Sequence, residues 1–169
     1  MAELDPVQKI KEKFSDKIVE VREKSPRRVY VTVRKEDAKD VVKYLFEDLK
    51  ARFITTSALD TSPGIEMLHH FAFDALGKVV SVKTLVPMPS PEIETVSLII
   101  PGAEYIEREI FDILGVHFSN HPNLKRFILG DDWPEGEYPY RREYKGRFPY
   151  RTEEGRDLYR QQIQERGKK

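Results

Sequence analysis

The chain has 169 residues and a formal net charge of zero, because 29 Lys and Arg balance 29 Asp and Glu. This length corresponds to one domain, and a hydrophobic content of 39% supplies one core, which excludes a largely disordered chain. The absence of cysteine excludes disulfides, a thiol nucleophile and an iron–sulfur cluster held by cysteines of this chain. No apolar run reaches the roughly 18 residues of a bilayer span, and the charged start is unlike a signal peptide. We therefore expect a cytoplasmic protein, or one bound peripherally to the cytoplasmic side of the cell membrane.

Hydrophobic periodicity predicts a helix, two strands, a second helix and three strands in the first half of the chain. The two helices are expected at residues 5–14 and 36–49, and the five strands at 17–23, 28–34, 52–59, 65–73 and 78–86. Short turns with Pro, Ser or Gly separate neighbouring strands, which favours antiparallel pairing. This order predicts a two-layer α+β domain whose five-stranded sheet is mainly antiparallel and open on one face.

The pattern changes after residue 86. Three prolines between residues 87 and 91 exclude a central strand and predict a linker. A third helix is expected at residues 103–114, because Gly115 follows it as a C-terminal cap. The remaining chain is rich in Pro, Arg and aromatic residues and has too few periodic apolar residues for a core. We therefore divide the protein into an α+β domain, residues 1–130, and an extended tail, residues 131–169, that lies along a partner.

The third helix carries an unusual set of charges. On a helical wheel the apolar stripe contains Ile106, Ile110, Ile113 and Leu114. Arg108 and Asp112 lie opposite this stripe, where an exposed i,i+4 ion pair is expected. Glu107 falls close to the stripe, so burial would desolvate its carboxylate unless a partner reaches it. We expect that partner to be an arginine, from this chain or from another, and we expect the loss of Glu107 to destabilise the protein more than the loss of Asp112.

Two catalytic or metal-binding interpretations of this region are weaker. Glu107 and Glu109 point about 200° apart on a helix, so they cannot share a substrate as an acid and base pair. His117 and His121 have the i,i+4 spacing of a zinc helix, but a glycine and a proline beside them disfavour a helix there. Two histidines without further ligands do not complete a metal site. A capped helix with charged side chains, followed by a His-Pro turn, explains each residue taken singly.

Two other functions are disfavoured. Residues 141–169 hold ten basic and five acidic side chains, and such a tail can bind nucleic acid. The rest of the chain is net acidic and lacks the known RNA-binding motifs, which argues against this function. An enzymatic site around His69 and His70 is disfavoured as well, since the two side chains point to opposite faces of one predicted strand. No nucleophile or phosphate-binding loop accompanies them.

One long pattern is more specific than any of its parts. Its residues are Pro101, Gly102 and Ala103 before the helix, then Glu107, Arg108, Glu109, Asp112, Gly115, Phe118, His121, Pro122, Leu124, Arg126, Asp132, Trp133, Pro139, Arg141 and Arg142. This pattern resembles the signature of one family of respiratory complex I proteins, that of the hydrophilic "30-kilodalton" subunit. The predicted order of helices and strands is also that of the family.

The departures from the family pattern are informative. Glu104 and Tyr105 stand where an Asn-Trp pair is common, and Asn123 stands where Asp is usual. Tyr138 and Tyr140 flank a proline where the family often has His and Leu. With these differences, the chain resembles the corresponding subunit of an energy-converting membrane-bound [NiFe] hydrogenase. Asn and Gln together number only six, which is typical of thermophiles and fits an archaeal source.

The resemblance implies a structural subunit of an oxidoreductase complex. It implies no catalytic residue, cofactor or metal in this chain, and [4Fe-4S] clusters, with a NiFe centre in a hydrogenase, in other subunits. The implied partners are the catalytic large subunit and the iron–sulfur small subunit of a hetero-oligomer that contacts the membrane only through other subunits; no nucleic acid is implied. A ferredoxin-dependent, H2-evolving hydrogenase is favoured, and a sulfur reductase or an NAD(P)H or quinone oxidoreductase is the alternative. The implied interface and ion-pair residues are Glu107, Arg108, Glu109, Asp112, His121, Arg126, Trp133, Tyr140, Arg141 and Arg142.

Overall fold

A computed structural model describes residues 5–145 of the chain. Its first elements are the helix α1 (Pro6–Lys13), the strands β1 (Ile18–Ser25) and β2 (Arg28–Val33), the helix α2 (Lys35–Lys43) and a π-helical turn η1 (Tyr44–Asp48). The strands β3 (Arg52–Thr61), β4 (Gly64–Phe73) and β5 (Lys78–Pro87) follow, with a 3-10 turn η2 (Asp74–Leu76) before the last of them. A short strand β6 (Glu92–Glu94), the helix α3 (Ala103–Leu114) and a short strand β7 (His117–Ser119) complete the described elements.

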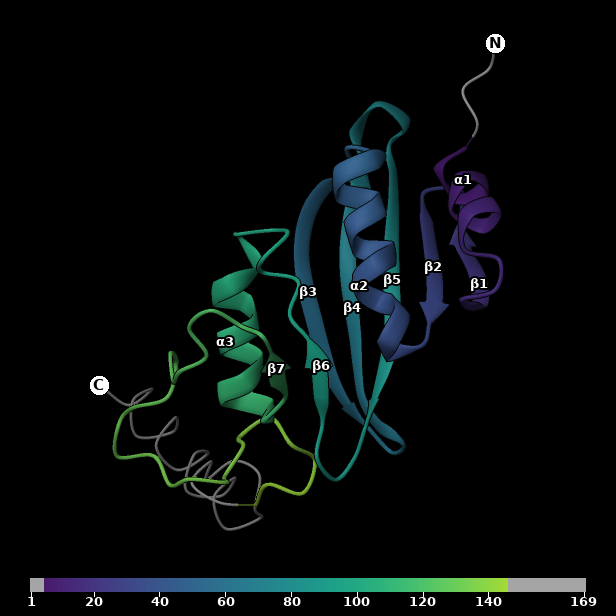
Figure 1. The fold of residues 1–169 in the computed structure, drawn as a ribbon. Coiled ribbons are helices and arrows are strands. Elements are labelled where there is room, and N and C mark those ends of the chain that lie inside the picture. The colour runs from purple at the N-terminus through teal and green to yellow at the C-terminus, as the bar shows by residue number, and fades with distance from the viewer. Residues whose placement is uncertain (1–4, 146–169) are drawn as a thin grey trace, which may run out of the picture.

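The sheet confirms the predicted fold class. Its five strands lie in the order β1-β2-β5-β4-β3, and β2 and β5 are parallel while the other neighbours are antiparallel. Figure 1 shows α2 across the front of the sheet, α1 beside β1 and β2, and α3 beside β3. The second layer is thus helical, as the sequence predicted. No described helix has the length and apolar character needed to cross a bilayer.

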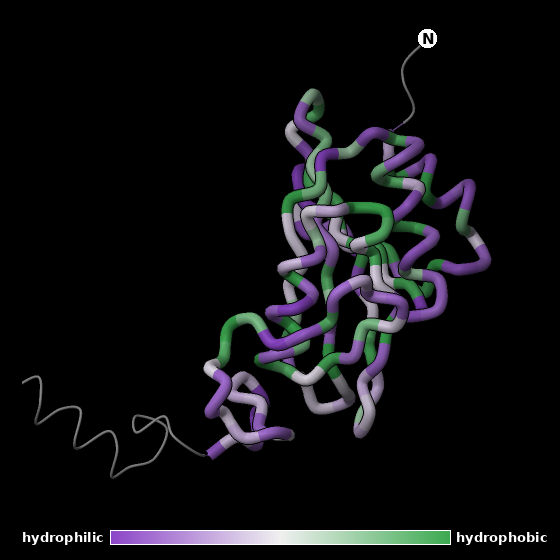
Figure 2. The backbone as a smooth tube through the Cα atoms, turned by 60° about the vertical axis from the view of Figure 1, so that its left-hand side comes forward, coloured by the Kyte–Doolittle hydropathy of each residue, from purple (hydrophilic) through white to green (hydrophobic). Residues whose placement is uncertain are grey.

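The core lies between the sheet and its helices. Val31 of β2 faces Val82 of β5 in register, and Met67, Val41 and Leu45 are buried on the same side. The alternation predicted for the strands therefore places one set of side chains inside, as their pleat requires. Figure 2 shows that hydrophobic residues concentrate in the sheet region, whereas the last described segment, next to the grey C-terminal trace, is mostly hydrophilic.

The two neighbouring histidines of β4 lie on opposite faces, as predicted. His69 is fully buried, and its Nδ1 lies 2.9 Å from the Thr56 hydroxyl. Burial lowers the pKa of His69 to about 4, so the ring is neutral at physiological pH. His70 faces the other side and lies within hydrogen-bonding distance of the Ser57 and Ser81 hydroxyls.

Two elements differ from the sequence prediction. The second helix was expected to run without interruption to residue 49, but α2 changes to the π-helical turn η1 at Tyr44, where the Leu49 N–H donates to the Tyr44 carbonyl. No strand was predicted after the Pro-rich linker, yet the short strand β6 follows it directly and pairs in parallel with β7. That pairing joins residues on either side of α3, and no local periodicity could indicate it. The linker thereby leads the chain from the sheet to α3.

Candidate functional site

The helix α3 organises the region that the sequence pattern singled out. It starts after Gly102 and ends at Gly115, which has a left-handed conformation with φ 69° and donates its N–H to the Phe111 carbonyl. Its apolar residues pack into the core, but Glu107, Arg108 and Asp112 are buried as well. A buried charged side chain must be hydrogen-bonded to be tolerated, so the partners of these three define the site.

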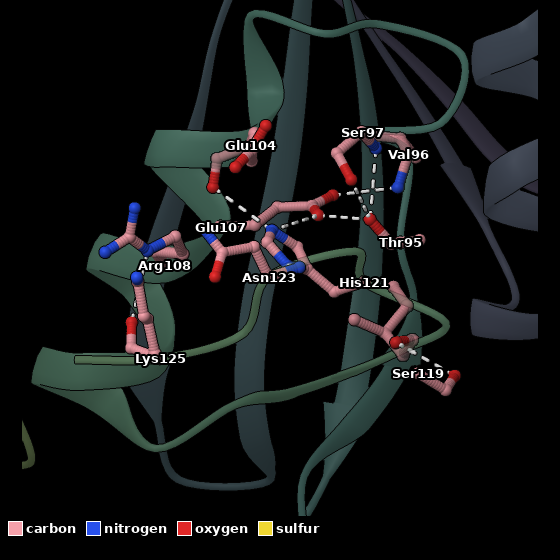
Figure 3. Close-up of polar contacts among 11 residues, drawn as sticks. Thr95, Val96, Ser97, Glu104, Glu107, Arg108, Ser119, His121, Asn123 and Lys125 are labelled. Carbon is pink, nitrogen blue, oxygen red and sulfur yellow. Dashed lines mark hydrogen bonds and ion pairs between the residues drawn. The ribbon is translucent and has the colours of Figure 1, made fainter. Parts of the chain in front are cut away.

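Glu107 holds the segment that precedes α3. Its carboxylate accepts a hydrogen bond of 2.8 Å from the Val96 N–H and another from the Thr95 hydroxyl, and the side chain is fully buried. The Ser97 N–H donates in turn to the Thr95 hydroxyl at 3.1 Å. Figure 3 shows these residues converging on one side of α3. Glu107 therefore fixes residues 95–97 against the helix.

His121 completes this buried cluster. Its Nε2 lies 3.7 Å from the Glu107 carboxylate and 3.2 Å from the Glu104 carbonyl, and its side chain is also inaccessible to solvent. The Asn123 N–H donates to Nδ1 at 3.0 Å, so Nδ1 is the acceptor nitrogen and Nε2 carries the proton. His121 thus donates from Nε2 to the Glu104 carbonyl and lies beside the Glu107 carboxylate.

Burial brings the pKa of the Glu107 carboxyl close to neutral pH. Burial raises its pKa from 4.5 to about 7, although the hydrogen bonds from Thr95 and Val96 oppose this rise. The burial predicted for Glu107 is confirmed. Among residues 5–145 its carboxylate pairs with Thr95, Val96 and His121 and with no arginine, and an arginine from another chain stays a prediction. A wheel of one helix cannot show the backbone N–H groups that a preceding loop brings to it.

Arg108 and Asp112 act together on the loop at residues 125–129. The Arg108 guanidinium donates to the Lys125 and Arg126 carbonyls at 3.2 and 3.1 Å. One oxygen of Asp112 accepts the N–H groups of residues 127, 128 and 129 at 3.0, 2.8 and 2.7 Å. Two residues one helical turn apart therefore satisfy both the carbonyls and the amides of this loop.

The predicted exposed ion pair between Arg108 and Asp112 is wrong. Both side chains are buried, and each of them binds backbone groups of the loop. The helix face that a wheel assigns to solvent is covered by the loop, which folds back from the end of α3. Of the predicted charges on this helix, Glu109 alone is exposed in the described structure. The expectation that Asp112 matters less than Glu107 loses its basis here.

Arg126 and Trp133 stabilise the next turn of the chain. The Arg126 guanidinium donates to the Gly130 and Trp133 carbonyls at 3.0 and 2.7 Å and lies 3.6 Å from Asp112. The Trp133 indole N–H donates to the Glu137 carbonyl at 2.8 Å, and its ring packs against Tyr144. Both side chains thus bind groups of this chain, while their predicted contact with a partner subunit stays a prediction.

The chain then returns to the C-terminal end of α3. Arg141 is buried, donates to the Leu114 carbonyl and stacks over the Tyr138 ring. That ring covers Gly115 so closely that a Cβ there would lie 2.4 Å from it. The position after α3 must therefore be glycine for two reasons, its positive φ and this contact.

Two predicted anchors lie at the surface. The Tyr140 N–H donates to the Ile113 carbonyl at 3.1 Å, but its side chain is 62% exposed. Arg142 is exposed too, and its N–H donates to the Asp60 carboxylate at 2.9 Å. The part of the predicted tail that the structure describes thus contacts its own domain, and its predicted contact with a partner stays a prediction. The division at residue 130 stays a prediction, and residues 146–169 lie outside the described part.

Some residues of the site were missed by the sequence analysis. Thr95 and Ser97 lie in a segment without periodicity or charge, and no signal marks them as partners of Glu107. Tyr138 was noticed only as a departure from a family pattern, although its contact with Gly115 and Arg141 is structural. In residues 5–145, no three histidine or acidic side chains gather as a metal site would require.

The comparisons with known proteins agree with this arrangement. A subunit of the F420H2 dehydrogenase of Methanosarcina mazei is 37% identical over 143 residues, which cover 83% of this chain and 89% of that protein. The beta subunit of the membrane-bound hydrogenase of Pyrococcus furiosus is 30% identical, and the match covers 82% of this chain and 83% of that protein. A solved structure of the membrane-bound sulfane sulfur reductase, an archaeal respiratory membrane complex, has a chain with a TM-score of 0.73 and 27% identity, covering 83% of this chain and 84% of that one.

The family itself follows from the central part of the sequence. Residues 31–150 match the family described as respiratory-chain NADH dehydrogenase, 30 Kd subunit. This match includes the second half of β2, all elements from α2 to β7 and the described part of the tail, and thus the whole buried charge arrangement. The chain belongs to the 30 Kd subunit family of the respiratory-chain NADH dehydrogenase.

Proposed function

We propose that this chain is a non-catalytic structural subunit in the peripheral arm of a complex I-like membrane-bound oxidoreductase. The observation that carries this proposal is the use of the motif charges: Glu107, Arg108 and Asp112 each bind backbone groups or loop side chains of this chain. Such contacts hold loops of this chain against α3, which supports a structural role for these charges. Membership of the 30 Kd subunit family supports the same function.

The partners proposed are the catalytic large subunit and the iron–sulfur small subunit of the same complex. The relatives and the solved match named above are subunits of multi-subunit complexes, which supports a hetero-oligomer. In this proposal the chain holds no cofactor, and the [4Fe-4S] clusters lie in other subunits. Because electron transfer slows steeply with distance, a subunit that fixes these two neighbours relative to each other contributes to turnover without touching a substrate. Contact with the cytoplasmic side of the membrane is then made through the other subunits.

Several complexes compete as the host, and a sulfur reductase and an NAD(P)H or quinone oxidoreductase stay alternatives to the two compared next. A ferredoxin-dependent, H2-evolving hydrogenase, with a NiFe centre in its large subunit, is supported by the 30% identical hydrogenase subunit of Pyrococcus furiosus. A complex that oxidises F420H2 is supported by the 37% identical dehydrogenase subunit of Methanosarcina mazei. The two differ in the electron donor and in the large subunit, so the neighbouring subunits decide between them.

The test is to purify the affinity-tagged chain from membranes of its own organism in mild detergent. We expect it to bring down a large subunit and an iron–sulfur small subunit, identified by mass spectrometry. Hydrogen evolution from reduced ferredoxin, or oxidation of F420H2 or NADH, by the purified complex identifies the host. Recovery of the chain alone, or with nucleic acid that salt removes, would contradict the proposal.

A further inference from the structure

Two exposed aromatic side chains, Tyr105 and Phe127, are in contact beside α3, and the exposed Ile128 follows Phe127 in the chain. Tyr105 in the first turn of the helix is 57% exposed, and Phe127 and Ile128 in the loop are 45% and 53% exposed. The Tyr105 and Phe127 rings are in contact, with their centroids 5.4 Å apart. We call these three residues the Tyr105 patch. Single exposed apolar residues are ordinary, but a contiguous group that includes two aromatic rings is typical of a binding surface.

The Tyr105 patch is held in a fixed shape. Phe127 and Ile128 are the residues whose N–H groups Asp112 binds, and Arg108 holds the carbonyls just before them. The loop is therefore fixed by two buried charges, while its apolar side chains point to solvent. Fixing a surface before binding lowers the entropy lost when a partner docks. A loop that is fixed before a partner binds is therefore suited to be a docking surface.

The positive charges near the patch indicate that a partner segment bound there carries a negative charge. The Arg108 guanidinium lies 4.7 Å from the Phe127 ring centroid and 5.6 Å from that of Tyr105. Among the described residues, its hydrogen-bond partners are two carbonyls, and no carboxylate forms an ion pair with it. Figure 3 shows it on the side of α3 away from Glu107. The exposed Lys125 adds a second positive charge next to the patch.

We propose that the Tyr105 patch binds a companion subunit of the complex through an apolar segment that carries a carboxylate. The apolar side chains of that segment cover the two rings and Ile128, and its carboxylate pairs with the exposed Lys125, while the buried Arg108 beneath the rings adds positive charge to the site. A charge pair formed at the margin of an apolar contact orients the partner and disfavours a basic segment. This inference rests on the proposed function, because it names the surface by which the subunit is assembled.

The experiment uses the tagged full-length chain in its native complex. Phe127→Ser and Tyr105→Ser are compared with Leu76→Ser as a matched control. Leu76 is 59% exposed and belongs to η2, which connects β4 and β5 at the end of the sheet that Figure 1 draws at the top. We expect recovery of the companion subunits to fall about tenfold or more for the two patch variants, as for an aromatic anchor at an interface, and to be unchanged for the control. A photo-crosslinking amino acid at position 128 should attach to one companion subunit, in a peptide that contains Asp or Glu.

The outcomes separate the two proposals. If the wild-type chain recovers no companion subunit, the proposed function fails and this inference fails with it. If the wild type assembles and both patch variants assemble as well, the inference alone is overturned. A crosslink to residues 146–169 or to a second copy of the chain also overturns it. Thermal melts of the purified variants show whether they fold. If one of the two patch variants does not fold, Ile128→Ser is used in its place.

Discussion

The sheet layer, residues 18–87, and the α3 region, residues 95–142, are held together by different contacts. In the sheet layer most buried side chains are apolar, as at Val31, Leu45 and Val82, and His69 is a buried polar exception among a few others. In the α3 region, buried charged residues such as Glu107 and Asp112 hold loops through hydrogen bonds to the backbone. Apolar burial is non-directional and tolerates exchange between side chains of similar size. Hydrogen bonds to fixed backbone groups require one side chain at one position.

This difference explains why the α3 region carries the recognisable pattern. Val, Ile and Leu can replace one another in the sheet, so many sequences give the same layer. A carboxylate that accepts several N–H groups has no substitute, because a shorter, longer or neutral side chain leaves some of them unsatisfied. The following predictions test this contrast, from the largest expected effect to the smallest.

Leu45→Ala should have the largest effect, because this fully buried residue belongs to the apolar core of the sheet layer. We expect the free energy of unfolding to fall by about 2–5 kcal/mol. Leu45→Met keeps the volume and should cost less than about 1.5 kcal/mol. Urea denaturation of both variants measures this, and an equal loss for Met and Ala would contradict the proposed tolerance of the core.

Asp112→Ala should destabilise the protein by about 3 kcal/mol, because it removes a charged acceptor from three backbone N–H groups. Asp112→Asn keeps the volume but loses the charge, so it should still cost more than Leu45→Met. The control is Glu109→Ala, an exposed change on the same helix that should stay within about 0.5 kcal/mol. Urea denaturation distinguishes them, and a small effect of Asp112→Ala would restore the view of an exposed ion pair.

Glu107→Gln should remove part of the pH dependence of stability. Folding raises the pKa of Glu107 from 4.5 to about 7, so the folded state binds this proton more tightly. The contribution of this proton to the free energy of unfolding is fully present below pH 4.5 and is lost as the pH rises through about 7. Between pH 5 and pH 8 we expect the wild type to lose about 2 kcal/mol more than the variant.

Unfolding by urea at both pH values measures this difference. Other titrating groups contribute equally to the two proteins, so they cancel in the comparison. A parallel pH dependence in wild type and Glu107→Gln would show that Glu107 keeps an ordinary pKa. A smaller loss of stability in the wild type than in the variant would contradict the direction of the shift.

Gly115→Ala should cost about 2 kcal/mol, because φ is 69° there and the new methyl group would meet the Tyr138 ring. Gly77→Ala is the matched control, since φ is 56° and no atom lies within 4 Å of the new Cβ. Its cost should be about 1 kcal/mol, from the backbone alone. Thermal melts measure both, and the double variant Gly115→Ala with Tyr138→Ala should recover the part due to the contact.

Most of the sheet layer was predictable from the sequence. The five strands and the helices α1 and α2 follow from period-two and helical patterns, because each presents one apolar face to the core. The parallel pairing of β2 with β5 did not follow, since it joins strands with β3 and β4 between them in the sequence. The pairing of β6 with β7 was missed for the same reason.

The site was predicted as a set of residues but not as a set of contacts. Glu107 was correctly expected to be buried, because its place on the helical wheel depends only on the geometry of one helix. Its partners within the described chain come from the segment before α3 and include Thr95 and Val96, which no helical wheel indicates. Asp112 was expected in solvent because the loop that covers it follows α3 by more than ten residues.

The sequence alone determined the α+β class, the position of α3 and the charge pattern of the family. These depend on hydrophobic periodicity and on local rules such as the glycine cap at Gly115, which act within a few residues. The tertiary structure decided which groups satisfy the buried charges and which apolar side chains remain exposed above them. Those outcomes depend on where distant loops return to the helix, and a buried charge accepts whichever donors the fold brings within hydrogen-bonding distance.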